Sequence, residues 1–190
     1  MLAAPTFPAA ASPALPAREA YRLWAPRYAA ETAISHLENL TVCALDVATA
    51  GRSVLDVGCG TTRRLSGSGA AFAIGMDLSP EMLGKRTLDA RARKTSVVAA
   101  DGCAVPFAPA SFDVVWCRLM IGHVRDLRAV YAELSRVCVA GGSVVVSDVT
   151  PEAIAAGHRR TFVDVDGRTR EVDHVVHTSA NHAAAAGDAG

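Results

Sequence analysis

The feature that most constrains how this chain can fold is the glycine loop that follows the short apolar run 53–57. The run has the composition of a buried strand, and it carries Asp56 one residue before its end. Gly58 and Gly60 then permit a tight turn into a helix that we expect to begin near Thr61. The segment therefore predicts a strand, a turn and a helix arranged so that backbone can approach a ligand closely.

A second candidate strand, 70–77, places another carboxylate, Asp77, about 20 residues after Asp56. From the end of the next strand a carboxylate can accept hydrogen bonds from both hydroxyls of a ribose. Such charge-assisted bonds contribute about 1.5–3 kcal/mol each when they are shielded from water. Asp77 is therefore the candidate for binding a ribose.

The chain beyond the glycine loop alternates short apolar runs with helical segments, which predicts a parallel sheet covered on both faces. Right-handed crossovers then give a doubly wound α/β fold, with mostly parallel strands and ligands at their carboxyl ends. The further strands are expected at 96–100, 112–117 and 143–147, and the helices at 32–48, from 79 onward and at 127–138.

Charged side chains gather where these candidate strands end. Because the carboxyl ends of parallel strands share one edge of the sheet, we expect these side chains to lie near one another. Burying a charge costs free energy unless the charge is paired. Several charged residues at one edge of the sheet therefore indicate a ligand-binding site. The residues concerned are Asp56, Asp77, Asp101, Arg118 and Asp148.

The organisation along the chain is that of one domain with an N-terminal leader. Residues 1–17 are rich in Ala and Pro and are expected to be a disordered leader, and 18–150 form the ligand-binding domain. Residues 151–190 are expected to add a hairpin, turned at Asp166-Gly167, and a C-terminal helix to the same domain.

Composition excludes several classes of protein. The formal net charge is zero, which argues against a nucleic-acid partner, since binding to phosphates needs a surplus of positive charge. No apolar run approaches the roughly 18–20 residues that a membrane span requires. The five cysteines form no C-x-x-C pair and favour a reducing, cytoplasmic location over a disulfide scaffold.

Several segments together resemble the successive motifs of class I S-adenosylmethionine-dependent methyltransferases, in the family's order. The small-molecule branch is the most similar, and 21–28 (YRLWAPRY) resembles the N-terminal helix of the malonyl-carrier-protein and quinone methyltransferases. The resemblance implies a Rossmann-like methyltransferase fold and the cofactor S-adenosyl-L-methionine. The other matching segments are 56–60 (DVGCG), 75–83 (GMDLSPEML), 100–107 (ADGCAVPF), 111–115 (SFDVV) and 134–142 (LSRVCVAGG).

The resemblance also implies roles for individual residues. Asp77 would accept hydrogen bonds from the ribose hydroxyls. Leu78 and Met82 would pack on the face of the adenine, and Asp101 and Gly102 would contact its edge. The methionine end of the cofactor would lie against the glycine loop and against Arg118, the cation at the end of the fourth strand. The residues of the loop segment that would bind the cofactor are Asp56, Gly58, Cys59, Gly60 and Thr61.

The chain departs from the family's pattern in two places. Thr62 stands where the family has a third glycine, and it either crowds the cofactor or caps a short helix. The family usually continues past the fifth strand to an antiparallel strand pair, for which this sequence has no candidate. We therefore expect these C-terminal strands to be missing, and either a truncated chain or a compact variant would explain that.

Three other features have both a functional and a structural interpretation. His123 is a candidate general base near the methyl acceptor, or else a histidine with purely structural hydrogen bonds. Tyr21 and Trp24 share a helix face with Tyr28 and serve either as a lid or as core packing. The histidines near 174–182 suggest a metal site, but a strand would point them to opposite faces, so we expect none.

The sequence thus predicts an enzyme that transfers a methyl group from S-adenosylmethionine to a small-molecule or carrier-bound acceptor, in an unspecified oligomeric state. One competing class is a non-catalytic cofactor-binding protein, which the threonine in the loop and the missing strands favour. A nicotinamide-dependent oxidoreductase is the other, but its fingerprint requires a third glycine where this chain has Arg63.

Overall fold

The computed structural model describes residues 13–28, 32–86 and 95–190. Helices and strands alternate along most of this length, as the apolar pattern predicts. The helical elements are α1 (Ala17–Trp24), η1 (Ala25–Arg27), α2 (Ala33–Ala44), α3 (Pro80–Leu83), η2 (Ile121–His123), α4 (Leu127–Val137), α5 (Pro151–Ala155) and α6 (Ser179–Ala189). The strands are β1 (Ser53–Val57), β2 (Phe72–Asp77), β3 (Thr95–Ala99), β4 (Phe112–Arg118), β5 (Cys138–Ser147), β6 (Thr161–Val163) and β7 (Thr169–Glu171).

Five of the strands form one parallel sheet in the order β3-β2-β1-β4-β5. The chain runs outward in one direction from β1 to β3 and then crosses back to add β4 and β5 on the other side. The strand order therefore reverses between β1 and β4, which is where doubly wound sheets bind their ligands. This topology confirms the predicted doubly wound α/β fold.

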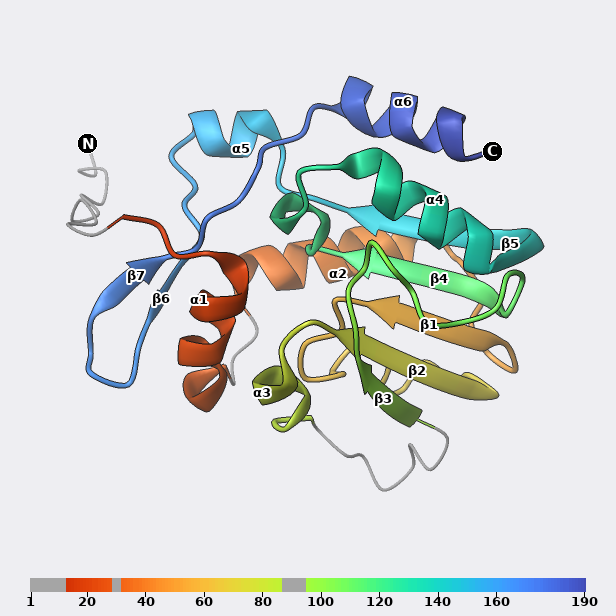
Figure 1. Cartoon of the computed structure of the whole chain (residues 1–190), viewed down its shortest axis with the longest axis horizontal. Coiled ribbons are helices and arrows are strands. Elements are labelled where there is room, and N and C mark those ends of the chain that lie inside the picture. The colour runs from red at the N-terminus through yellow and green to blue at the C-terminus, as the bar shows by residue number, and fades with distance from the viewer. Residues whose placement is uncertain (1–12, 29–31, 87–94) are drawn as a thin grey trace.

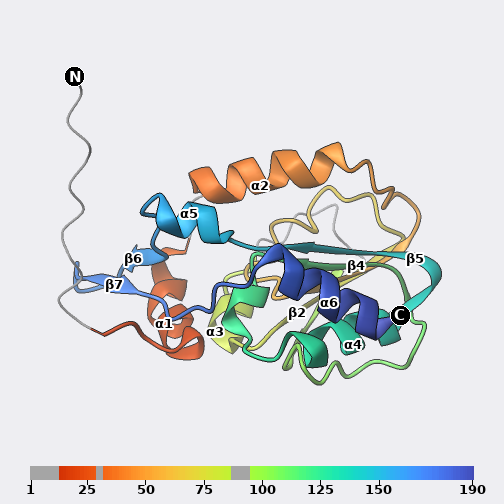
Figure 2. The same cartoon turned by 90° about the horizontal axis from the view of Figure 1, so that it is seen from above.

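The sheet is the middle of three layers. Seen from above, α2 covers one face of the sheet, while α4 and α6 cover the other (Figure 2). The strands point their carboxyl ends toward α1 and the β6–β7 hairpin, which lie together beyond that edge (Figure 1). The main core fills the α4 side, where Leu55, Val115, Ile121 and Leu134 are fully buried. No described helix is long and apolar enough to cross a membrane.

Helix α2 differs from the prediction in its length and in the face that it buries. The expected helix at 32–48 ends at Ala44. Leu37 and Leu40 share a helix face with other apolar residues, a spacing that predicts a buried stripe, yet both side chains are more than half exposed. Ser35 is buried in their place, and Glu38 faces the sheet edge. The partners of Glu38, described below, explain this inverted orientation.

The glycine loop also differs from the prediction, because no helix begins near Thr61. The chain makes a series of turns instead, with Thr62 N donating to Cys59 O and Leu65 N donating to Thr62 O, both at 3.0 Å. Thr62 has a φ of 61°, in the left-handed region that favours glycine. The threonine therefore occupies a backbone conformation typical of the glycine that it replaces, and it caps no helix.

The N-terminal end of the described chain pairs with the segment that follows β7. Leu15 N donates to Glu171 O at 2.8 Å, and Asp173 N donates to Leu15 O at 2.7 Å. Residues 13–17 are thus ordered, which shortens the leader expected over 1–17; its first twelve residues lie outside the described part. The predicted hairpin around Asp166-Gly167 is confirmed by the antiparallel β6–β7 pair. In the described part of the chain, no antiparallel pair extends the main sheet.

Candidate cofactor and acceptor site

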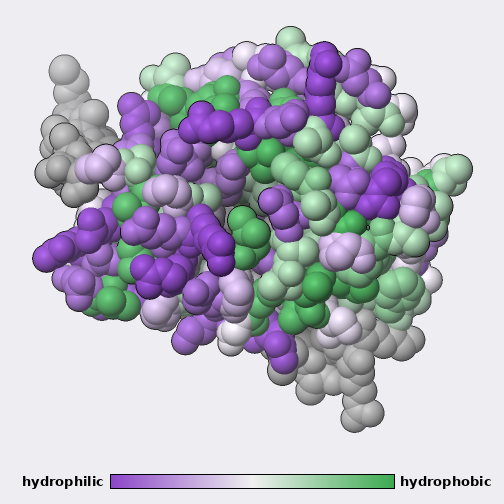
Figure 3. Space-filling view, viewed as in Figure 1, coloured by the Kyte–Doolittle hydropathy of each residue, from purple (hydrophilic) through white to green (hydrophobic). Residues whose placement is uncertain are grey.

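A cavity of about 780 Å³ opens at the carboxyl edge of the sheet. Its floor comes from the glycine loop and the ends of β2 and β4, and its cover comes from α1 and the segment 158–161. Hydrophilic side chains gather on the outside of this cover, over α1 and the hairpin (Figure 3). The cavity brings together most of the predicted site residues, namely Gly58, Gly60, Asp77, Leu78, Met82, Asp101, Gly102, Arg118 and His123.

Gly58 and Gly60 both have positive φ angles, 76° and 56°. A Cβ on Gly58 would lie 2.3 Å from Cγ of Met120, so the segment after β4 packs directly on the glycine loop. Met120 also approaches Gly102, where a Cβ would lie 3.1 Å from its Cε. The loop, the end of β3 and the segment after β4 therefore form one continuous surface on the cavity floor.

Asp77 ends β2 with its carboxylate at the cavity wall. Its Oδ2 accepts from Gly60 N at 2.8 Å, and its Oδ1 accepts from Ser79 N at 2.9 Å. Burial raises the pKa of Asp77, although these two backbone hydrogen bonds oppose the shift. Each carboxylate oxygen keeps a second lone pair, which leaves the group able to accept from the two hydroxyls of a ribose.

Leu78 and Met82 line the cavity beside Asp77. Leu78 is 48% exposed, and its apolar side chain offers a surface that a planar ring could cover. Ser79 caps α3, accepting from Met82 N at 3.3 Å, as predicted. Asp101 also lines the cavity, and its Oδ1 accepts from Cys103 N at 2.9 Å.

Three predicted residues lie beneath the glycine loop instead of at the cavity surface. Asp56 is fully buried, and neither of its oxygens has a hydrogen-bond partner in the described structure. Burial raises its pKa to about 6, against the nearby positive charges of Arg64 and Arg118. Cys59 is buried against Gly75, where burial raises the pKa of its thiol, and Thr61 is also buried.

Arg118 is held by a residue that the sequence did not single out. Its Nε and Nη2 donate to Oε1 and Oε2 of Glu38 at 2.7 and 2.9 Å. Ser147 Oγ donates to Glu38 Oε1 at 2.7 Å, and Arg64 lies 3.4 Å from Oε2. Burial alone would raise the pKa of Glu38, but these partners outweigh burial and lower it. Glu38 therefore fixes α2 to the rim of the sheet.

His123 faces two cavity residues, Tyr21 and Arg160. Its Nε2 is in close contact with Nη1 of Arg160 and lies 3.1 Å from the hydroxyl of Tyr21. Because a guanidinium can only donate, Nε2 accepts, and the ring proton lies on Nδ1, 3.4 Å from Asp173 O. Burial, followed by the charge of Arg160, lowers the pKa of His123 to about 3.

The aromatic stripe of α1 is both core and cavity wall. Trp24 stacks on Phe162 of β6 with ring centroids 5.0 Å apart, and Tyr21 stacks on Trp24 at 5.7 Å. Tyr21, Trp24 and Tyr28 also line the cavity. The stripe thus attaches α1 to the hairpin and positions Tyr21 above the floor.

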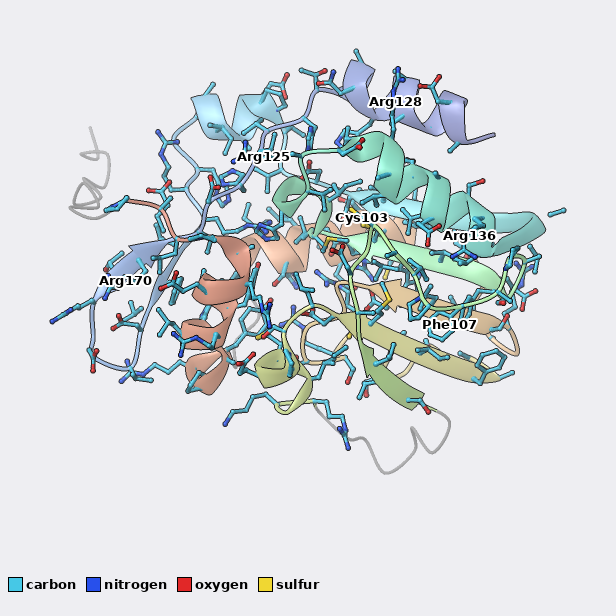
Figure 4. All side chains as sticks on the ribbon, viewed as in Figure 1. Cys103, Phe107, Arg125, Arg128, Arg136 and Arg170 are labelled. Atoms are coloured by element: carbon cyan, nitrogen blue, oxygen red, sulfur yellow. The ribbon has the colours of Figure 1, made fainter. Side chains whose placement is uncertain are left out.

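Of the other rim residues, Asp148 points away from the cavity. Its Oδ2 lies 3.4 Å from Nε2 of His182 on α6. No group of three or more His, Cys, Asp and Glu side chains in the described ranges could hold a metal ion. Figure 4 shows Cys103 and Arg125 near the cavity, whereas Arg128, Arg136 and Arg170 lie on the outside of the molecule.

Fold and site together define a doubly wound α/β protein with a cavity at the edge of the sheet where the strand order reverses. Residues 55–146 match the family model described as "Methyltransferase domain". The resemblance to S-adenosylmethionine-dependent methyltransferases is thereby confirmed.

Known relatives support the same assignment. The chain is 38% identical over 104 residues to the ubiquinone biosynthesis O-methyltransferase of Methylococcus capsulatus, covering 52% of this chain and 44% of the relative. It is 36% identical over 124 residues to the malonyl-[acyl-carrier protein] O-methyltransferase of Herminiimonas arsenicoxydans, covering 62% and 44%. The chain therefore spans less than half the length of these curated relatives.

Solved structures show the fold. An S-adenosylmethionine-dependent methyltransferase from Mesorhizobium loti superposes with a TM-score of 0.63 at 22% identity, covering 80% of each chain. The [4+2]-cyclase SpnF superposes with a TM-score of 0.68 at 19% identity, covering 94% of this chain and 73% of that one. Because the second of these proteins is a cyclase by name, the fold alone does not determine the reaction.

Proposed function

We propose that this protein transfers the methyl group of S-adenosyl-L-methionine to a small-molecule or carrier-bound acceptor. The observation that carries the proposal is the position of Asp77, whose carboxylate faces a cavity beside two positive-φ glycines and the apolar Leu78 and Met82. These residues fit the ribose, the amino-acid end and the adenine of such a cofactor. When bound, the cofactor supplies a methyl group on a positively charged sulfur.

The chain's own residues would bind and orient the two reactants. Asp77 accepts from the ribose hydroxyls, Leu78 and Met82 contact the adenine, and Asp101 accepts from its exocyclic amine. The cover made by Tyr21 and Trp24 excludes water, which favours a step in which positive charge is lost from sulfur. Most of the rate enhancement would come from holding the acceptor atom in line at about 3–3.5 Å.

The proposal of His123 as general base meets a specific obstacle. A base whose pKa is about 3 is a weak proton acceptor near neutral pH, and its Nε2 lone pair already faces Arg160. An acceptor that reacts as a carboxylate requires no base at all. The geometry therefore favours an acceptor whose reacting oxygen is already ionised.

One observation favours the second candidate function, a cofactor-binding protein without methyl transfer. The segment 61–67 that follows the glycine loop makes turns where a helix was expected. The cofactor-binding loop is therefore not held by a helix in the way that the sequence predicted. Such a protein would bind the cofactor tightly and turn over no acceptor. The nicotinamide alternative gains no support, because the matched family is that of methyltransferases.

A transfer assay separates these functions. Protein incubated with S-adenosylmethionine carrying a tritiated methyl group would be tested on carboxylic acids, phenols and carrier-bound acyl groups. Label in an acceptor, with an equal amount of S-adenosylhomocysteine formed, would support the proposal. Tight cofactor binding with no labelled product from any acceptor class would support the non-catalytic candidate instead.

We further propose a cytoplasmic location and no nucleic-acid partner. The five cysteines are all free, and the formal net charge is zero. We also propose that 18–150 is the cofactor-binding domain and that 151–190 belongs to it, because Phe162 and α6 pack against α1 and α4.

A further inference from the structure

Arg160 is an arginine of the cavity wall whose positive charge has no carboxylate partner among the described residues. It precedes β6, and its backbone is fixed by a hydrogen bond from Val172 N to Arg160 O at 2.8 Å. The side chain reaches inward and is only partly exposed. By contrast, Arg118 and Arg64 face Glu38, and Arg125 faces Asp173.

The contacts of Arg160 position one end of the guanidinium and leave the other end available. Nη1 contacts His123 Nε2, donates to Leu119 O at 3.1 Å and lies 3.4 Å from the hydroxyl of Tyr21. All three partners are uncharged. Nε and Nη2 make no hydrogen bond to any described residue, so the donors that could form a two-pronged contact with an oxyanion remain free.

The surroundings of Arg160 are organised to hold it in this place. Leu119, whose carbonyl accepts from Nη1, has a φ of 55°, a conformation that a leucine rarely adopts. Burial, with Arg160 as the second cause, lowers the pKa of both His123 and His158, so the neighbouring imidazoles add no positive charge near neutral pH. A strained backbone and two neutral histidines therefore surround the guanidinium of Arg160.

The position of Arg160 relates it to the reacting end of the proposed cofactor. Its partner Leu119 directly precedes Met120, which packs on Gly58 of the glycine loop. The guanidinium thus lies beside the segment that follows β4, and that segment packs on the glycine loop. An acceptor bound there would lie beside the methionine end of the cofactor.

We propose that Arg160 is the specificity-determining residue for the methyl acceptor, and that the acceptor carries an oxyanion, a carboxylate or a phosphate, which Nε and Nη2 of Arg160 bind. His123 and Tyr21 are the positioning residues of this guanidinium. The proposal rests on the proposed function for its relation to methyl transfer, while the anion site itself can be tested without the cofactor.

Calorimetric titration with succinate and with inorganic phosphate tests the site in the wild-type protein and in Arg160→Gln. We expect the variant to weaken binding of at least one of these anions by tenfold or more. Arg128→Gln, on the outer surface of α4, is the matched control and should bind as the wild type does. Comparing the two anions distinguishes a carboxylate from a phosphate group.

A measurement on the wild type alone keeps the proposal testable if Arg160→Gln does not fold. Succinamide has the shape of succinate without its charge, so it should not bind. Equal binding of succinate and succinamide, no binding of either anion, or unchanged anion binding in a folded Arg160→Gln protein would overturn the site.

Titration with S-adenosylhomocysteine separates this proposal from the proposed function. Protein that binds the anion through Arg160 but does not bind S-adenosylhomocysteine would contradict the proposed function and leave the anion site supported. Protein that binds S-adenosylhomocysteine but neither anion would overturn the anion site alone.

Discussion

Glu38 of α2 binds Arg118 at the end of β4 through two parallel hydrogen bonds, although the residues are far apart in sequence. Both side chains are almost completely buried, with 7% and 3% exposed. Removing one member of a buried ion pair leaves the other charge unpaired, which typically costs several kcal/mol. The pair therefore joins the N-terminal helices to the sheet edge where the site lies.

The first prediction concerns this pair. Glu38→Gln should lower the free energy of unfolding by about 3 kcal/mol, because Arg118 would lose its carboxylate while remaining buried. Urea unfolding followed by circular dichroism measures the change. Glu19→Gln, on the exposed side of α1, is the control and should have a much smaller effect. Similar values for the two variants would show that the pair is not a major source of stability.

A second prediction follows from the left-handed backbone of Thr62. Thr62→Gly should be more stable than Thr62→Ala by about 1 kcal/mol, because only glycine adopts a φ of 61° without strain. The neighbouring Thr61 does not have a positive φ. Thr61→Ala should therefore be at least as stable as Thr61→Gly. Thermal unfolding of the four variants makes the comparison. An alanine that is as stable as glycine at 62 would refute the assigned backbone.

The buried carboxyl of Asp56 predicts a dependence of stability on pH. Its pKa is raised to about 6 in the folded state because burial disfavours the charged form, whereas about 3.9 is normal for an unfolded chain. Between these values the folded state holds a proton that the unfolded state has lost, so this group lowers stability as the pH rises through that window. Above about pH 6 the loss is complete, at about 2–3 kcal/mol.

The Asp56→Asn variant lacks this titration and isolates its effect. The free energy of unfolding of the wild type, minus that of the variant, should fall by about 2–3 kcal/mol between about pH 4 and pH 7. Denaturant unfolding at several pH values gives the difference directly. A difference that stays constant over this range would mean that Asp56 titrates normally.

The environment of His123 predicts how methyl transfer depends on pH. With a pKa of about 3, this histidine does not change its protonation between about pH 5.5 and pH 8. The ratio of wild-type to His123→Gln activity should therefore be constant across that range, and the variant should raise KM more than it lowers kcat. A wild-type activity that falls below about pH 6.5, in a way that the variant lacks, would instead identify His123 as the general base.

Local features of this fold could be predicted from the sequence because neighbouring residues determine them. The run 53–57, the cap Ser79 and the turn at Asp166-Gly167 each depend on a few adjacent side chains, and the structure has them as expected. Asp77 and Asp101 could be placed at the cavity because parallel strands end at one edge.

The contacts made across long stretches of chain could not be predicted in this way. The apolar stripe of α2 suggested that Leu37 faces inward, but the buried charges of Arg118 and Arg64 require Glu38 there instead. The available signal was that Glu38 is the single acidic residue of α2. Arg160 meets Tyr21 only after the hairpin folds over α1, and nothing in the local sequence distinguishes it from the exposed Arg159.

The central claim is that Asp77 holds the ribose of an adenosyl cofactor, and calorimetric titration with S-adenosylhomocysteine tests it most directly. The wild type should bind one equivalent, and Asp77→Asn should bind about 10- to 150-fold more weakly, the equivalent of about 1.5–3 kcal/mol. Asp188→Asn, on the exposed face of α6, should bind as the wild type does. Equal affinity in Asp77→Asn, or no binding by the wild type, would contradict the account.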